Sequence, residues 1–173
     1  MDQYFYKKIN SPLGYLYLIT DDTHLRAVIY EKKQKQFEQL ISAATPRDNS
    51  LINLTELQLE QYFARERKIF DLPLFYEGTV FQVKAWNSLL QIPYGTTISY
   101  AKQAENIENH KAVRAIGHAN SLNPISIIIP CHRVIGKSGK LVGYGGGLDF
   151  KKYLISLETV SYTHLTLPTK RIV

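Results

Sequence analysis

The sequence predicts a mixed α/β fold of the α+β type, in which an antiparallel sheet comes first and helices follow. Two patterns predict it. Residues 4–30 consist of short apolar runs separated by turn residues, and the chain from Thr79 onward carries helix caps and helical spacing of apolar residues. The chain has 173 residues, 45% of them hydrophobic, so it can bury the core of one or two compact units.

Three strands are expected in the N-terminal part, over residues 4–9, 15–20 and 25–30. Turn residues such as Pro12 and Gly14 separate these runs. Because short strands joined by tight turns pair with opposite directions, we expect an antiparallel meander.

A helix is expected after the strands, over residues 51–64. The residues that recur there at helical spacing are Leu54, Leu57, Gln58, Gln61 and Tyr62. The extended segment 70–75, which contains Pro73, then connects to the second half. We therefore expect an N-terminal scaffold domain over residues 1–75 and a C-terminal domain over residues 76–158.

The second half predicts a series of helices. Thr79 and Gln82 have the spacing of a capping box, which opens a helix through residue 90. Ser99 is the expected N-cap of a short helix through residue 105, and another helix is expected over residues 109–120. The last two helices resemble a helix-turn-helix, although ordinary helical hairpins look alike.

The helix over residues 109–120 has a slim profile. Its small residues are Ala112, Ala115, Gly117 and Ala119, and its long cationic side chains are Lys111 and Arg114. A slim helix can press close to a DNA duplex and enter a groove. The same small residues also allow close packing on a neighbouring helix, so both interpretations stay open at this point.

The net charge of +6 is unevenly distributed along the chain. Residues 1–78 carry 10 Lys and Arg against 11 Asp and Glu, whereas residues 79–158 carry 9 against 4. A basic unit attached to a neutral scaffold favours a polyanionic partner such as a nucleic acid. Solvated lysines alone produce such a bias about as often.

Three features that the sequence lacks bear on where the protein works: a membrane-spanning run, a signal peptide and a second cysteine. No run approaches the roughly 18 apolar residues of a membrane-spanning helix, and the N-terminus lacks the layout of a signal peptide. We expect a cytoplasmic protein, or a nuclear one if the source is eukaryotic. Cys131 is the only cysteine, which excludes an internal disulfide and a cysteine-rich zinc site.

Residues 125–129 form an almost wholly apolar run, typical of a buried strand, that leads to Cys131 and His132. The thiolate is the reactive form of cysteine, and a histidine oriented by a carboxylate can accept the thiol proton. Asp149 and Glu158 are the only carboxylates after Cys131. In a strand, neighbouring side chains point to opposite faces, so the two residues need a turn or an intervening water to interact. A buried structural cysteine beside a surface histidine is the alternative.

Four glycines follow within residues 143–147, around Tyr144. Glycines at this density let the backbone approach a flat ligand closely and leave its N–H groups unshielded. Because no Gly-Lys-Ser/Thr sequence follows, a nucleoside triphosphate site is not expected.

The sequence of residues 129–136, IPCHRVIG, resembles the O6-alkylguanine-DNA alkyltransferases, also called methylated-DNA–protein-cysteine methyltransferases. Further motifs of that family occur in order and at the family's spacing. They lie at residues 78–82, 92–95, 98–100, 114–117, 123–124 and 143–148. The resemblance implies a ribonuclease-H-like antiparallel sheet with a helix, followed by a mostly helical, winged-helix-like domain with a helix-turn-helix.

The resemblance also implies the reaction. Cys131 would accept the alkyl group of O6-alkylguanine in double-stranded DNA, irreversibly and once per molecule, with O4-alkylthymine as a further candidate substrate. His132, held by Glu158, would activate the thiol through a water, and Asn123 would brace the junction between the DNA-reading helix and the active-site loop. This chemistry requires no metal and no organic cofactor.

Substrate recognition is implied in the same way. Tyr100 would act at the guanine N3, so that the base leaves as a neutral species. Tyr144 would cover the pocket. Backbone groups of Cys131, Val134 and Gly145 would recognise the guanine edge and the alkylated oxygen.

DNA would be bound through the minor groove, and the damaged nucleotide would be flipped out of the stack. Arg114 would fill the space that the nucleotide leaves, and Lys111, Ala115 and Tyr100 would also lie against the DNA. The resemblance implies a monomer, and cooperation between DNA-bound copies stays open.

Three other functions stay open from the residues. A lesion-binding relative would recognise alkylguanine without repairing it, but such relatives lack the acceptor cysteine. A cysteine hydrolase using Cys131 and His132 would turn over many times, whereas the transferase would give a stoichiometric burst. A helix-turn-helix regulator would prefer particular undamaged sequences.

The last segment, residues 159–173, has no counterpart in the family. It carries two cations and no acidic residue. We expect an appended tail that is either non-native or disordered. Because it follows Glu158 directly, the role of Glu158 depends on how far the last helix extends.

Overall fold

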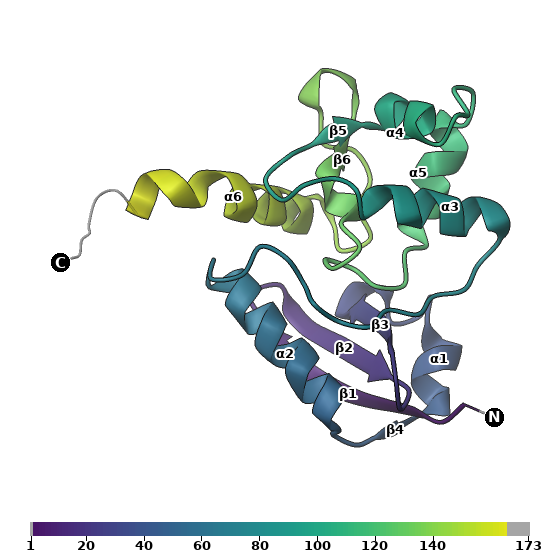
Figure 1. Cartoon of the computed structure of the whole chain (residues 1–173), viewed down its shortest axis with the longest axis vertical. Coiled ribbons are helices and arrows are strands. Elements are labelled where there is room, and N and C mark those ends of the chain that lie inside the picture. The colour runs from purple at the N-terminus through teal and green to yellow at the C-terminus, as the bar shows by residue number, and fades with distance from the viewer. Residues whose placement is uncertain (1, 166–173) are drawn as a thin grey trace.

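The N-terminal half of the computed structural model, which describes residues 2–165 and the side chains through Thr159, is a four-stranded sheet with two helices (Figure 1). The strands are β1 (Tyr4–Ser11), β2 (Gly14–Thr20), β3 (Leu25–Tyr30) and β4 (Ala44–Pro46). Their order is β3-β2-β1-β4, in which β1, β2 and β3 pair antiparallel and β4 pairs parallel with β1. The predicted antiparallel meander is confirmed.

The two faces of the sheet carry different helices, as Figure 1 shows. Helix α2 (Ser50–Phe63), which the helical spacing predicted, places Ile52 and Leu59 in the same core cluster as Leu16 and Leu18 of the sheet. The opposite face carries alternate residues of the same strands, and Leu40 and Ile41 of α1 (Glu38–Ala43) pack against it. The sequence pattern missed α1 and β4, because both are short and α1 follows a charged stretch.

The C-terminal half is mostly helical and contains a small parallel pair of strands. Its elements are α3 (Val80–Leu89), β5 (Ile98–Ser99), α4 (Tyr100–Asn106), α5 (Val113–Ser121), β6 (Val134–Ile135) and α6 (Leu148–Leu165). Helix α5 packs against α3 and α4. The helix expected over residues 109–120 begins only at Val113, because the preceding residues form a turn in which the Ala112 N–H donates to the Asn109 carbonyl at 3.0 Å. Within residues 2–165, none of the helices is long and apolar enough to cross a membrane.

The free edge of β3 holds the segment that leads to the cysteine. The Val28 N–H donates to the Pro124 carbonyl at 3.0 Å, and the Val28 carbonyl accepts from the Ser126 N–H at 3.0 Å. Nearer the start of the strand, Leu25 forms an isolated parallel bridge with Leu74 of the connector. Both attachments satisfy backbone groups of an edge strand that would otherwise be unpaired. The sheet of the first domain therefore fixes part of the second.

The prediction of a strand over residues 125–129 is wrong. Only Ile125 forms a bridge, with Val28, and the chain then turns, with Ile127 in the left-handed region at φ 74°. A β-branched residue in that conformation costs about 1–2 kcal/mol. The run is apolar because it is buried in the core cluster that joins the sheet to the C-terminal helices, and that burial holds the turn in place.

The N-terminus of α3 carries the predicted capping box. The Thr79 hydroxyl accepts from the Gln82 N–H at 3.1 Å, and the Gln82 side chain accepts from the Thr79 N–H at 2.9 Å. We expect Thr79→Ala to lower the free energy of unfolding by about 1 kcal/mol in urea denaturation, because two helix-end donors depend on this pair. Thr79→Ser keeps the hydroxyl and should retain most of the stability. Equal losses in both variants would contradict the prediction.

Helix α6 continues through Leu165, beyond the start of the segment expected to be a tail. The hydroxyl of Thr159 donates to the Ile155 carbonyl at 2.8 Å within this helix. Residues 166–173 lie outside the described part of the chain. The interpretation of residues 159–173 as an appended tail therefore stays a prediction, as do the domain boundaries at residues 75 and 158.

Candidate active site

Cys131 and His132 lie in a short 3-10 helix, Cys131–Arg133, and not at the end of a strand. The Cys131 N–H donates to the Ile129 carbonyl at 2.9 Å, which closes the turn before it. Successive side chains of a 3-10 helix project about 120° apart, so the opposite-face geometry of a strand does not apply. Cys131 lies on the wall of a pocket, whereas His132 is fully buried and does not line it.

The pocket at Cys131 has a volume of about 870 Å³ and is built from both domains. It brings together several of the residues that the resemblance implied, namely Cys131, Asn123, Tyr100, Tyr144 and Gly145. The N-terminal domain contributes Tyr30 and Lys33, which the sequence did not predict to be in the site. The pocket therefore depends on how the sheet docks onto the helical domain.

Asn123 links the turn to the sulfur. Its side-chain nitrogen Nδ2 donates to the Ile129 carbonyl at 2.8 Å and to the Cys131 Sγ at 3.3 Å. Its Oδ1 accepts from the Ile125 N–H at 3.0 Å. The amide thus spans the strained turn and at the same time offers a donor to the sulfur, which favours the thiolate.

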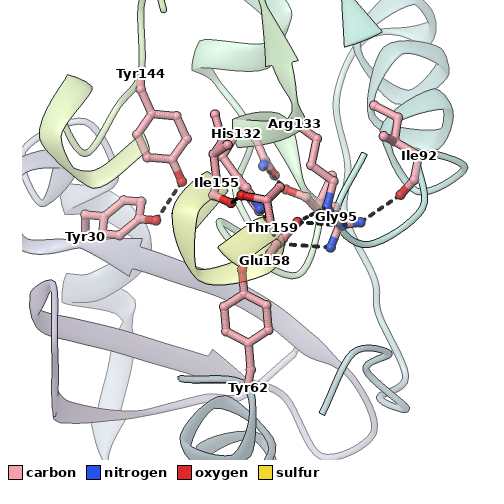
Figure 2. Close-up of polar contacts among 12 residues, drawn as sticks. Tyr30, Tyr62, Ile92, Gly95, His132, Arg133, Tyr144, Ile155, Glu158 and Thr159 are labelled. Atoms are coloured by element: carbon pink, nitrogen blue, oxygen red, sulfur yellow. Dashed lines mark hydrogen bonds and ion pairs between the residues drawn. The ribbon is translucent and has the colours of Figure 1, made fainter. Parts of the chain in front are cut away.

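Glu158 is the centre of a buried polar cluster (Figure 2). Its carboxylate lies 2.7 Å from the His132 Nε2 and accepts from the Arg133 Nε at 2.9 Å and the Tyr62 hydroxyl at 2.6 Å. The Gly95 N–H also donates to it, at 3.2 Å. Burial acts to raise the pKa of Glu158, but hydrogen bonds and positive charge from His132 and Arg133 outweigh it and lower the pKa to about 2.

The structure decides between the two carboxylates that the sequence left open. Glu158 contacts His132, whereas Asp149 is exposed in the first turn of α6. Arg133 and Tyr62 were not predicted as partners. For Arg133, the sequence held one signal of a buried ion pair, namely a charged residue in the middle of an apolar segment. No local pattern indicates the role of Tyr62, which lies 96 residues from Glu158.

The hydrogen bond to Glu158 sets the tautomer of His132. A carboxylate with a pKa of about 2 is ionised, so the neutral imidazole donates its Nε2 proton to Glu158 and keeps a lone pair on Nδ1. Among the described residues, Nδ1 is the one buried side-chain nitrogen or oxygen without a hydrogen-bond partner. Burial lowers the pKa of His132 and raises the pKa of the Cys131 thiol, which favours the neutral form of each. Nδ1 is the atom free to take the thiol proton.

Tyr100 is held by a buried lysine. Its hydroxyl donates to the Val142 carbonyl at 2.9 Å and accepts from the Lys151 Nζ at 3.3 Å. Lys151 also donates to the Val142 carbonyl at 3.0 Å and to the Gly143 carbonyl at 3.2 Å. Its side chain is fully buried, and burial lowers its pKa to about 8. Sequence reasoning missed Lys151, since a lysine on a helix is usually solvated.

Tyr144 is fixed over the pocket by the sheet. Its hydroxyl lies 2.6 Å from that of Tyr30 on β3, and the two rings pack edge to face (Figure 2). The neighbouring loop needs Gly146, because a Cβ atom there would lie 2.7 Å from the Phe150 ring. The glycine-rich segment therefore serves close packing around the pocket.

Besides His132 and Glu158, four of the residues implied by the resemblance lie away from the pocket wall. Val134 is fully buried in β6, and its N–H donates to the Cys131 carbonyl. The other three, Lys111, Arg114 and Ala115, are exposed near the start of α5. The opposite side of α5 packs against α3 and α4, and its residues Ile116, Ala119 and Asn120 are buried. No group of three or more His, Cys, Asp and Glu side chains among the described residues could hold a metal ion.

Fold and site together define a two-domain protein in which a buried cysteine, backed by a histidine–carboxylate pair, opens into a pocket between the domains. Residues 4–76 match the family model described as 6-O-methylguanine DNA methyltransferase, ribonuclease-like domain. Residues 80–160 match the model described as 6-O-methylguanine DNA methyltransferase, DNA binding domain. The helix-turn-helix within the second domain stays a prediction.

Individual relatives agree with the family models. The methylated-DNA–protein-cysteine methyltransferase of Methanosarcina acetivorans is 46% identical over 89% of this chain and 97% of its own length. The constitutive enzyme of that name from Bacillus subtilis is 38% identical over 91% and 97%. The crystal structure of Mycobacterium tuberculosis O6-methylguanine methyltransferase superposes with a TM-score of 0.83 at 43% identity, covering 91% of this chain and 94% of that one. The chain belongs to the methylated-DNA–protein-cysteine methyltransferase family.

Proposed function

We propose that the protein repairs DNA by direct reversal, moving the alkyl group of O6-alkylguanine onto Cys131. The observation that carries this proposal is the position of its one cysteine. Cys131 opens into a pocket that also contains Tyr100 and Asn123, and the next residue, His132, is paired with Glu158. This arrangement supplies a nucleophile, a proton acceptor and a proton donor around one cavity.

The reaction balances with the groups of this chain and one bridging water. The Cys131 proton passes through the water to the His132 Nδ1, and Glu158 stabilises the imidazolium that forms. The thiolate sulfur then bonds to the alkyl carbon while the carbon–oxygen bond breaks. The electron pair stays on the guanine, whose N3 takes the Tyr100 proton. The carbon–sulfur bond of the thioether product does not hydrolyse under ordinary conditions, so each molecule acts once.

DNA recognition is assigned to the exposed part of α5. Arg114 is exposed there beside the small Ala115, so the helix can approach a duplex closely, and Lys111 is exposed in the turn before the helix. A Mycobacterium tuberculosis relative, 43% identical with a TM-score of 0.83, has been crystallised in complex with DNA. We assign α4 and α5 to a helix-turn-helix that binds the minor groove, with Arg114 replacing the flipped nucleotide. Extrusion costs a few kcal/mol, and less for a damaged base.

The cellular setting follows from the same chemistry. A reactive thiol without a disulfide partner suits a reducing compartment, so we place the protein in the cytoplasm. We propose that it acts as a monomer on DNA, without a metal or organic cofactor. Basic residues give an attraction to DNA that does not depend on sequence, which suits a protein that must find lesions in any context.

The test is transfer from a duplex containing O6-methylguanine, followed by mapping of the methyl group with peptide mass spectrometry. We expect methyl on Cys131 in a one-to-one burst and no transfer by Cys131→Ser. Tight binding with unchanged DNA would instead identify a lesion sensor. Repeated turnover of an ester or amide would identify a hydrolase, and preference among undamaged sequences would identify a regulator.

A further inference from the structure

The pocket wall contributed by the N-terminal domain carries a buried lysine. Lys33 lies in the short 3-10 helix Glu31–Lys33 directly after β3, is 8% exposed, and lines the same pocket as Cys131. Its Nζ donates to the Ser121 carbonyl at the end of α5. Its stem fills the space beside Gly145, where a Cβ atom would overlap it. One side chain from the sheet domain thus contacts both α5 and the glycine-rich loop.

The charge of Lys33 has no acidic partner in the described part of the chain. Its contacts are a neutral carbonyl and the ring of Phe37, whose centroid lies 5.5 Å from the Nζ. Burying an ammonium group without a counter-charge is unfavourable, and burial accordingly lowers the pKa of Lys33. The anion that the reaction creates in this pocket is the thiolate of Cys131.

We propose that Lys33 is a positioning residue whose positive charge stabilises the Cys131 thiolate, so that the N-terminal domain takes part in activating the nucleophile. This inference rests on the proposed function. The inference accounts for the buried charge of Lys33, because an ammonium and a thiolate that share one pocket of low polarity attract each other strongly. It also makes the reactivity of the cysteine depend on how the N-terminal domain docks onto the helical one.

Several other titratable groups face Cys131 from the elements around it. They are Lys151 from α6, Tyr100 from α4, Tyr30 from β3, Tyr144 from the glycine-rich loop and His132 beside it. Burial raises the pKa of each of the three tyrosines, so they stay neutral. Burial raises the pKa of Cys131, and the Asn123 hydrogen bond and the charges of Lys33 and Lys151 oppose this rise. Lys32 and Lys35 also line the pocket, but the charges that oppose the rise in the pKa of Cys131 are those of Lys33 and Lys151.

The test separates charge from packing. Lys33→Gln removes the charge but keeps a donor for the Ser121 carbonyl, Lys33→Arg keeps the charge, and Lys33→Met keeps the aliphatic stem as a second uncharged variant. Lys8→Gln is the matched control, because Lys8 is exposed on β1 and lies outside the pocket. For each folded protein, two rates are measured across pH: alkylation of Cys131 by iodoacetamide without DNA, and single-turnover methyl transfer from an O6-methylguanine duplex.

Lys33→Gln and Lys33→Met should slow both reactions about tenfold near neutral pH, which corresponds to a tenfold smaller thiolate fraction. The rates should converge with the wild type at high pH, where the thiol is ionised in every variant. Lys33→Arg and Lys8→Gln should keep the wild-type profile. If Lys33→Gln and Lys33→Met lose the same fraction of each rate at every pH, or if their rate–pH profiles match that of the wild type, the inference is overturned. Failure of the wild type to transfer methyl at all would overturn the proposed function instead, and the iodoacetamide profiles would still decide the role of Lys33.

Discussion

Glu158→Gln should abolish most alkyl transfer and destabilise the fold in the same step. The substitution keeps the shape of the side chain but leaves the buried Arg133 guanidinium without its counter-charge, and breaking such a pair costs about 3–5 kcal/mol. It also removes the group that stabilises the His132 imidazolium. We expect the single-turnover rate to fall by about 10²–10⁴-fold.

A double variant separates the two effects. Removing both charges with Glu158→Gln and Arg133→Met should restore much of the free energy of unfolding, because replacing a buried ion pair by uncharged residues is often nearly neutral. The transfer rate should stay low, since His132 still lacks its carboxylate. Recovery of both stability and rate in the double variant would contradict the role assigned to Glu158.

The same carboxylate predicts how the stability depends on pH. The pKa of Glu158 is lowered from 4.5 to about 2 in the folded protein. The ionised carboxylate therefore contributes its full stabilisation of the fold above the pKa of the unfolded chain, and this stabilisation is lost as the pH falls through the pKa of the folded protein. The difference in unfolding free energy between the wild type and Glu158→Gln should therefore shrink as the pH falls from about 4.5 to about 2. Urea denaturation at several pH values measures this difference.

Tyr100→Phe should slow alkyl transfer by about 10²–10⁴-fold while leaving the fold and the DNA affinity nearly unchanged. The hydroxyl supplies the proton for the guanine N3, so the departing base would carry an uncompensated negative charge in the variant. Two hydrogen bonds are lost, one to the Val142 carbonyl and one from the Lys151 Nζ, but Lys151 still donates to the Val142 and Gly143 carbonyls, so the stability should fall by about 1 kcal/mol.

The measurement for Tyr100 is a single-turnover rate with protein in excess over an O6-methylguanine duplex, together with a binding titration. Tyr153→Phe, which removes a hydroxyl from an exposed tyrosine of α6, is the control and should behave as the wild type. If Tyr100→Phe transfers methyl at the control rate, Tyr100 only shapes the pocket and another group protonates the base. A loss of DNA affinity that accounts for the whole loss of rate would equally contradict proton donation.

The regular elements could be read from the sequence because their signals are local. The turn around Gly14 and the short apolar runs on both sides of it predicted β1 and β2, and Thr79 with Gln82 predicted the start of α3. The only cysteine was the candidate nucleophile from the start, but the residues alone also allowed a structural cysteine, and the family resemblance selected its role. The segment 125–129 could not be read, since an apolar run looks alike whether it forms a strand or a buried turn.

The sequence alone determined the three strands of the meander, the longer helices, the family, and the cysteine with its neighbouring histidine, because each depends on neighbouring residues or on a residue type that occurs once. The tertiary structure alone decided how the site is assembled. Tyr62 reaches Glu158 across 96 residues, Lys33 meets Ser121 across 88, and the edge of β3 holds the turn before Cys131. Such contacts arise from docking one domain on the other, and no local pattern carries their geometry.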